Sequence, residues 1–95
     1  MMILRIVKME FKPESVSAFD ALFKQAHAKI EAMPGCNRVQ ILRGIDNPCL
    51  RTTLSWWERP EDLEAYRRSE LFGQVWPETK AMFQSSPVAW STDWP

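Results

Sequence analysis

Two residues that occur once each in the chain, His27 and Tyr66, are the main candidates for proton chemistry. Histidine changes charge near neutral pH, and a tyrosine hydroxyl can donate to an oxygen that gains negative charge. His27 lies at the rim of the apolar stripe of a predicted helix, about 80° from its centre at ~100° per residue. We predict catalytic roles for both residues. The alternatives are a surface histidine and a tyrosine whose hydroxyl bonds to the backbone.

Aromatic side chains are abundant, with five Trp, five Phe and one Tyr in 95 residues. A domain of this size buries only about 60% of its unfolded surface, so some rings should line a pocket or contact another subunit. We predict that Phe23, Phe72 and Trp76 bind substrate, although simple core packing gives the same pattern. Trp56 and Trp57 are neighbours in a predicted strand and must face opposite sides. The sequence does not determine which of the two faces the helices.

The composition argues against several kinds of site. A single histidine excludes a two-histidine metal centre, and Cys36 and Cys49 form no CxxC pair, so we expect no metal. No glycine-rich phosphate-binding motif occurs, so we expect no nucleotide cofactor. The two cysteines can be free thiols or a disulfide. Free thiols are the commoner state in a chain without a secretory context.

The charges balance, with 12 Lys and Arg against 12 Asp and Glu. A nucleic-acid surface or a polybasic membrane anchor needs an excess of cations, so we expect neither partner. No apolar run approaches the roughly 20 residues that cross a bilayer. We therefore expect a cytoplasmic protein.

Hydrophobic periodicity predicts four strands, at residues 3–11, 37–43, 49–57 and 88–94. The first helix should begin in the turn at residues 12–15 and end at Pro34-Gly35, where Gly35 can adopt a left-handed conformation. Its polar face includes Asp20. Residues 59–83 predict one or two helices, with Pro77 in the first turn of a new segment or at a kink.

This order predicts a single α+β domain over residues 1–95, with the ferredoxin-like βαββαβ arrangement. Its four-stranded antiparallel sheet would carry helices on one face only. Because both faces of the strands carry large apolar groups, the other face needs a covering layer, and we predict a homodimer with sheets packed face to face. Trp90 and Trp94 share a face of the last strand and are predicted dimer contacts.

Arginines on the predicted strands can bind an acidic or enolate oxygen of a ligand, but an ion pair with a carboxylate on a neighbouring strand or on the dimer mate is the simpler interpretation. This applies to Arg5, Arg43 and Arg51. Arg67 and Arg68 lie among acidic residues of a predicted helix, which is typical of a solvated face.

Several short motifs resemble the antibiotic biosynthesis monooxygenase family of dimeric α/β-barrel proteins. They are Pro34-Gly35-Cys36, Leu54-Ser55-Trp56-Trp57-Glu58, Pro60-Glu61-Asp62-Leu63, Tyr66-Arg67-Arg68-Ser69 and Leu71-Phe72. The resemblance implies a small dimer with a pocket between the helices and the sheet of each protomer. It also favours Trp57 over Trp56 as the pocket residue. Many members carry histidine at the position of Tyr66.

A haem-degrading branch of the same superfamily is a poorer match. Its pattern has an asparagine on the first strand and a helix histidine about nineteen residues after the strand-three tryptophan. This chain has Ile6 and Trp76 at those places. The iron ligand is therefore absent.

The family resemblance implies a cofactor-independent monooxygenase that acts on a small aromatic or quinol-type molecule. In such enzymes the ionised substrate itself supplies the electrons that reduce dioxygen. Two alternatives remain: a non-catalytic dimeric module that binds a small ligand or supports a pathway partner, and an isomerase or lyase that uses the same pocket. The sequence does not identify the substrate.

Overall fold

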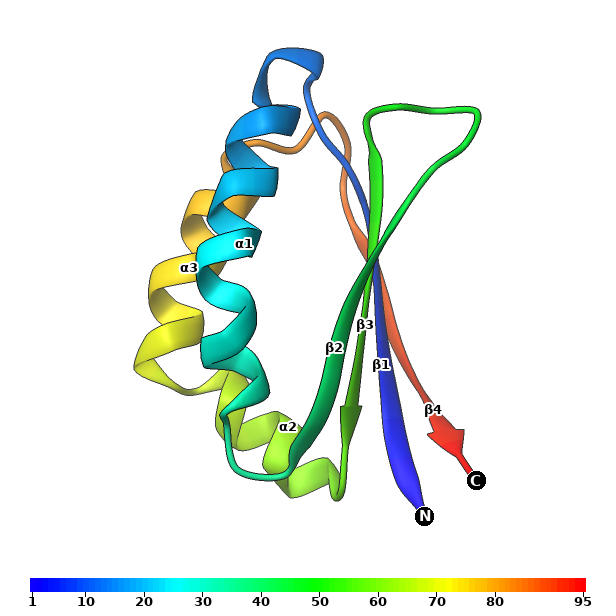
Figure 1. The fold of residues 1–95 in the computed structure, drawn as a ribbon, viewed down its shortest axis with the longest axis vertical. Coiled ribbons are helices and arrows are strands. Elements are labelled where there is room, and N and C mark those ends of the chain that lie inside the picture. Colours follow the sequence, from blue (N-terminus) through cyan, green and yellow to red (C-terminus); the bar gives the residue numbers. More distant parts are fainter.

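The computed structural model describes residues 1–95 and confirms the predicted order of elements. Strands β1, β2, β3 and β4 span Met2–Glu10, Cys36–Arg43, Leu50–Trp57 and Val88–Trp94. A 3-10 turn, η1, at Pro13–Ser15 leads into α1 at Val16–Glu31, while α2 spans Pro60–Arg67 and α3 spans Glu70–Lys80. All three helices cover the same face of the sheet (Figure 1). The fold is the α+β ferredoxin-like arrangement.

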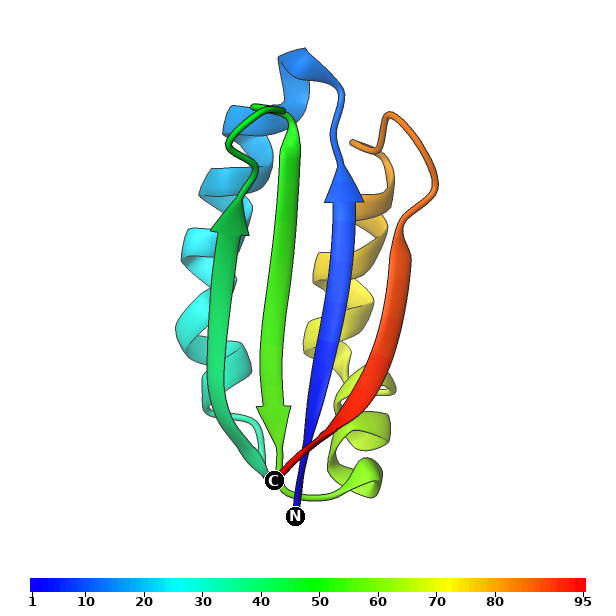
Figure 2. The same cartoon turned by 90° about the vertical axis from the view of Figure 1, so that its right-hand side faces the viewer.

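The sheet has the strand order β2-β3-β1-β4, and all neighbouring strands are antiparallel (Figure 2). The central strand β1 therefore lies between β3 and β4. Successive side chains of a strand point to opposite faces. Trp57 packs against Ala26 and Ile30 of α1, so the odd-numbered residues of β3 face the helices. Trp56 lies on the outer face, as the resemblance implied.

The turn between α1 and β2 depends on Gly35. Its φ of +81° is in the left-handed region, as predicted. A Cβ atom at this position would overlap the side chain of Asp62 in α2. The backbone carbonyl of Gly35 also accepts a 2.8 Å hydrogen bond from the Glu58 amide after β3. Gly35 thus holds the end of α1 close to the start of α2.

The predicted helical region at residues 59–83 contains two helices that meet at Ser69. The Ser69 hydroxyl donates to the Tyr66 carbonyl at 2.6 Å and accepts from the Phe72 amide at 3.1 Å, so it caps α3. Pro77 lies inside α3 and does not begin a new segment, which corrects that expectation. The carbonyl that loses its partner belongs to the exposed Gly73, where water can replace the missing amide.

The core consists of two clusters between the helices and the sheet. Trp57 is fully buried in one of them, with Val39 of β2 and the inner residues of α1. Phe11 is fully buried in the other and stacks on Phe19, with ring centroids 4.2 Å apart. No helix is both long enough and apolar enough to cross a membrane.

Candidate functional site

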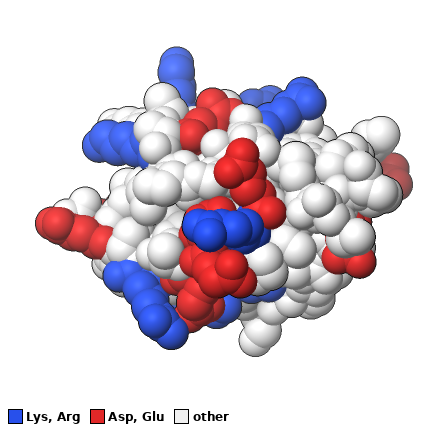
Figure 3. Space-filling model, turned by 90° about the horizontal axis from the view of Figure 1, so that it is seen from below, with Lys and Arg blue, Asp and Glu red and all other residues white.

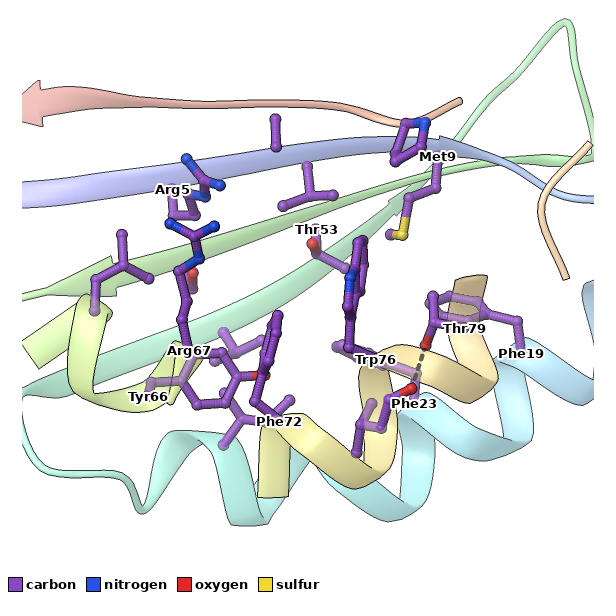
Figure 4. A pocket seen from close by; sticks show the side chains of 18 residues that line it. Arg5, Met9, Phe19, Phe23, Thr53, Tyr66, Arg67, Phe72, Trp76 and Thr79 are labelled. Carbon is purple, nitrogen blue, oxygen red and sulfur yellow. Dashed lines mark hydrogen bonds between the residues drawn. The ribbon is translucent and has the colours of Figure 1, made fainter. Parts of the chain in front are cut away.

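A pocket of about 230 Å³ lies between the helices and the sheet (Figure 4). The pocket has 18 lining residues, which come from all three helices, all four strands and the segment before β4. Twelve of the 18 are hydrophobic. Arg67 and Ala89, at the β4 side, are lining residues exposed to solvent, so the pocket opens there. Its volume is below the ~300 Å³ at which pockets accept drug-sized ligands. It suits a small, flat, largely apolar molecule.

Aromatic rings of α2 and α3 form one wall of the pocket. Tyr66 and Phe72 meet edge to face, with centroids 5.3 Å apart. Phe72 and Trp76 are nearly parallel at 5.7 Å and 17°. Phe23 of α1 also lines the pocket. The structure thus brings together four of the six predicted site residues, and the Ser69 cap between α2 and α3 fixes the relation of Tyr66 to Phe72.

Tyr66 is a half-buried polar residue of this wall. Its ring stacks on Trp57 at 5.2 Å and 24°. Burial, with a smaller contribution from the neighbouring Cys36, raises the pKa of Tyr66 to about 12. The phenol therefore stays neutral at physiological pH and keeps its proton for donation to a ligand oxygen.

Trp57 lies behind the pocket rather than in its lining, because the ring is completely buried between Tyr66 and the core. Its indole Nε1 donates a 2.9 Å hydrogen bond to the Ser55 hydroxyl. Ser55 lines the pocket two residues earlier on the same face of β3. Since the serine oxygen already accepts from Trp57, its own proton is free to be donated elsewhere. Trp57 contacts the site through Ser55.

His27 lies outside the pocket lining. Its Nε2 donates to the Val39 carbonyl at 2.7 Å and lies 3.3 Å from the Glu31 carboxylate. The same carboxylate accepts from the Val39 amide at 2.9 Å. The His27 and Glu31 side chains of α1 thus form hydrogen bonds with the backbone of Val39 at the free edge of β2. The sequence predicted that His27 lies at the rim of the apolar stripe of its helix. In the structure this rim faces the edge of β2 and not the pocket.

Arg51 forms an ion pair, as predicted, but its partner lies on α1 and not on a neighbouring strand or a dimer mate, which corrects that expectation. Its guanidinium is buried and donates to both oxygens of Asp20, at 3.0 and 3.1 Å. It also donates to the carbonyls of Pro48 and Leu50. Asp20 was expected on the solvent face of its helix. It lies instead at the margin that meets β3, because a buried cation there needs a carboxylate.

Arg5 and Arg67 differ from Arg51, because both line the pocket and neither forms such a pair. Arg5 is half-buried, and its one side-chain hydrogen bond is a 3.3 Å contact to the Ser91 hydroxyl. Burial, with the nearby positive charge of Arg67, lowers the pKa of Arg5. Arg67 approaches Glu64 at 3.7 Å, a carboxylate that lies closer to Arg68, at 3.2 Å. The prediction that Arg67 lies on a solvated helix face is correct, since the residue is exposed. That prediction did not include its position in the lining of the pocket.

The pocket lining contains no Asp, Glu or His. Its polar groups are the two arginines, the Tyr66 phenol and a few Ser and Thr hydroxyls. No three His, Cys, Asp or Glu side chains anywhere in the chain come together in a way that could hold a metal ion. Cys36 and Cys49 are both free thiols. The site can therefore solvate negative charge on a ligand, and it has no carboxylate or imidazole to act as a base.

Comparison with protein families decides where this fold and pocket belong. The family model described as antibiotic biosynthesis monooxygenase matches residues 2–76. The chain belongs to this family. The match covers β1 to most of α3, and therefore includes every element of the pocket except β4 and the segment before it. A comparison with curated proteins finds no match.

Solved structures with the same fold include several antibiotic biosynthesis monooxygenase proteins. A conserved protein from Methanosarcina mazei Go1 is 23% identical, with a TM-score of 0.92 over 97% of this chain and 91% of that one. A putative antibiotic biosynthesis monooxygenase from Bordetella bronchiseptica is also 23% identical, with a TM-score of 0.87 over 99% and 97%. SnoaB from Streptomyces nogalater, a cofactor-independent oxygenase, is 13% identical, with a TM-score of 0.87 over 97% and 91%. These similarities show the shared fold.

Proposed function

We propose that this family member is a cofactor-independent monooxygenase that acts on a small aromatic or quinol-type molecule. One observation carries the proposal: an aromatic pocket whose polar lining contains hydrogen-bond donors and no carboxylate or imidazole. Such a lining stabilises a substrate that carries negative charge on oxygen. Family membership and the fold shared with SnoaB support the same activity.

The reaction requires no electron source besides the substrate. In an anthrone-type substrate, a methylene group ionises to an enolate, which transfers electrons to dioxygen. One oxygen atom becomes the new carbonyl, and the other leaves as water with the two hydrogens that the methylene carbon loses. The substrate supplies all four electrons. The protein must bind the ring, stabilise the enolate oxygen and exclude bulk water.

Each of these tasks has a group in the pocket. Phe72, Trp76 and Phe23 bind the flat ring by stacking and apolar contact. The neutral Tyr66 phenol donates to the developing oxyanion. Trp57 acts as a positioning residue through its hydrogen bond to Ser55. We assign no proton transfer to His27, because its Nε2 is occupied by the Val39 carbonyl.

The missing general base also favours one other function. Without a carboxylate or imidazole in the lining, the pocket would suit a non-catalytic module that binds a small aromatic ligand. The same experiment separates the two, because a binding module is stabilised by ligands that it does not consume.

The test follows oxygen uptake by the purified protein with a panel of anthrones and hydroquinones, in the presence of chelator and without flavin. We expect uptake above the spontaneous rate, and a decrease of about 10²-fold in Tyr66→Phe, the cost of losing one oxyanion donor. His27→Ala is the matched control and should retain the wild-type rate. Uptake at the spontaneous rate throughout would refute the proposal. Thermal stabilisation without turnover would then indicate the binding module, and substrate loss without oxygen would indicate an isomerase or lyase.

We also propose that the chain forms a homodimer through the outer face of its sheet. Trp90 and Trp94 are 44% and 48% exposed there, and Trp94 meets Trp56 edge to face at 5.7 Å. Exposed apolar groups also come from the edge strands, at Leu42 and Val88. Several large apolar side chains exposed on one face of a sheet are typical of a subunit interface.

Analytical ultracentrifugation tests the dimer. We expect a dimer at micromolar concentration and a monomer for Trp90→Glu, which would place an unpaired charge in the interface. Gln25→Glu adds the same charge on an exposed part of α1 and should leave the dimer intact. A wild-type chain that sediments as a monomer would refute this association.

A further inference from the structure

We propose that Arg5 and Arg67 form an anion site at the open end of the pocket, which selects aromatic ligands that carry an acidic oxygen as phenolate or carboxylate. The inference rests on the proposed function, because it names the class of substrate that the same pocket takes. It also defines a binding preference that can be measured without turnover.

The two arginines reach the same point from opposite walls of the pocket. Arg5 projects from the central strand β1, and Arg67 projects from the last turn of α2. Figure 4 shows their guanidinium groups turned toward one another at one end of the cavity, away from Met9 and Phe19. A ligand oxygen at this end would therefore lie between two cations.

Hydroxyl groups extend the polar character of this end across the sheet. In the strand register, Arg5 pairs with Ser55 of β3 on one side and with Ser91 of β4 on the other. Directly opposed residues share a face, with Cβ atoms about 4.5–5.5 Å apart. Ser55, Arg5 and Ser91 thus form a polar row on the helix-facing side of the sheet, in a surface that is otherwise mostly apolar.

Neither arginine of this pair has a carboxylate of its own, which favours an anionic ligand between them. Where the chain buries an arginine for structure, it supplies a bidentate carboxylate, as Asp20 does for Arg51. No ion pair of the chain includes Arg5, and Arg67 only shares the rim carboxylate of Glu64 with Arg68. Two cations held near each other in a partly dry pocket repel, and an anion between them removes that cost.

The adjoining wall defines the rest of the ligand. Tyr66 and Phe72 lie beside Arg67, and Trp76 continues the wall toward the closed end (Figure 4). A ring placed along this wall would put one substituent at the arginines. Since the lining has no base, the two cations would favour the ionised form of a phenol directly, with water accepting the proton. The same arrangement would bind a ready-made carboxylate.

Calorimetric titration with matched naphthalene ligands tests the site. 2-Naphthoate and its neutral amide, 2-naphthamide, have the same ring and nearly the same shape. We expect the wild type to bind the carboxylate at least about tenfold more tightly, the range of one charge-assisted hydrogen bond. Arg67→Met should abolish this preference and leave amide binding within about twofold. Arg67 is exposed, so its replacement does not threaten folding, and Arg5→Met is the second variant.

Arg68→Met provides the matched control. Arg68 is the next residue, forms an ion pair with the same Glu64, and lies outside the pocket lining. A parallel arm follows the absorbance of bound 2-naphthol, whose ionisation should shift to lower pH in wild type and not in Arg67→Met. The proposal holds if the preference for the carboxylate or for the naphtholate is lost in Arg67→Met and in Arg5→Met and is retained in Arg68→Met. Equal binding of the acid and the amide with no naphthol shift, no binding of any probe, or equal effects of Arg67→Met and Arg68→Met would overturn it.

The outcome is independent of catalysis. A carboxylate preference with no oxygen uptake would leave the anion site intact and refute the oxygenase. Oxygen uptake without any preference for the charged ligand would support the oxygenase and refute the anion site.

Discussion

Tyr66 offers a direct spectroscopic test of the pocket, because it is the only tyrosine in the chain. Its raised pKa, at about 12, follows mainly from burial between Trp57 and Phe72. A shift of two units from the ordinary value of 10.0 lowers the ionised fraction at pH 10 from one half to about 1%. The pKa can therefore be tested by raising the pH of the folded protein and following the ionisation of Tyr66.

The measurement follows tyrosinate absorbance, to which the five tryptophans contribute no ionisation. We expect a single transition centred near pH 12 in the folded protein, and a transition near pH 10 in denaturant. Tyr66→Phe should remove the signal in both conditions. A folded-state midpoint near pH 10 would refute the burial of the hydroxyl and its role as a neutral donor.

The same shift affects stability with a definite sign. Because the folded-state pKa is above the unfolded value, the neutral phenol's contribution is complete below pH 10 and is lost as the pH rises to about 12. The loss is of the order of 2 kcal/mol for a two-unit shift. Wild type should lose this much more stability than Tyr66→Phe across that window, as measured by urea unfolding at fixed pH. Equal losses in both proteins would contradict the linkage.

Three further substitutions test the framework around the pocket by urea unfolding. Gly35→Ala should cost about 1–3 kcal/mol, because φ is +81° and the new methyl would overlap Asp62; an unchanged midpoint would contradict this strain. Asp20→Ala should cost about 2–3 kcal/mol, since it leaves the buried Arg51 with backbone carbonyls only; a loss below about 1 kcal/mol would mean that water replaces the carboxylate. Ser69→Ala should cost about 1 kcal/mol by removing the cap of α3. Gly73→Ala, whose methyl meets no atom within 4 Å, is the control and should not destabilise.

Patterns that depend on local spacing were predictable from the sequence. The last strand has the predicted bounds, and the alternation of β3 separates Trp56 from Trp57 as expected. The left-handed Gly35 follows from the Pro-Gly pair at a helix end. In each case the physical cause acts over a few residues, so the printed sequence contains it.

Features that depend on how elements meet were less accessible. Arg67 looked solvated because its helix carries many charges, and it borders the pocket because the last turn of α2 brings it near Arg5 of β1. His27 looked available for proton transfer because a residue at the rim of a helix stripe can face either a pocket or the surface. In the structure its Nε2 bonds to the Val39 carbonyl at the edge of β2. Asp20 and Arg51 are 31 residues apart. The sequence named Arg5 among the strand arginines that can bind a ligand oxygen, but it gave no sign of the neighbouring Arg67 on α2.

The place of β1 in the middle of the sheet has a consequence for how the protein is made. Arg5 and Ser91 bond across 86 positions of chain, so β1 leaves the ribosome long before the strand that pairs with one of its edges. Until β4 arrives, one side of β1 is an open edge, and open edges invite pairing with other chains. Nascent molecules are therefore exposed to aggregation along β1 until β4 has emerged, and the pocket can close only afterwards.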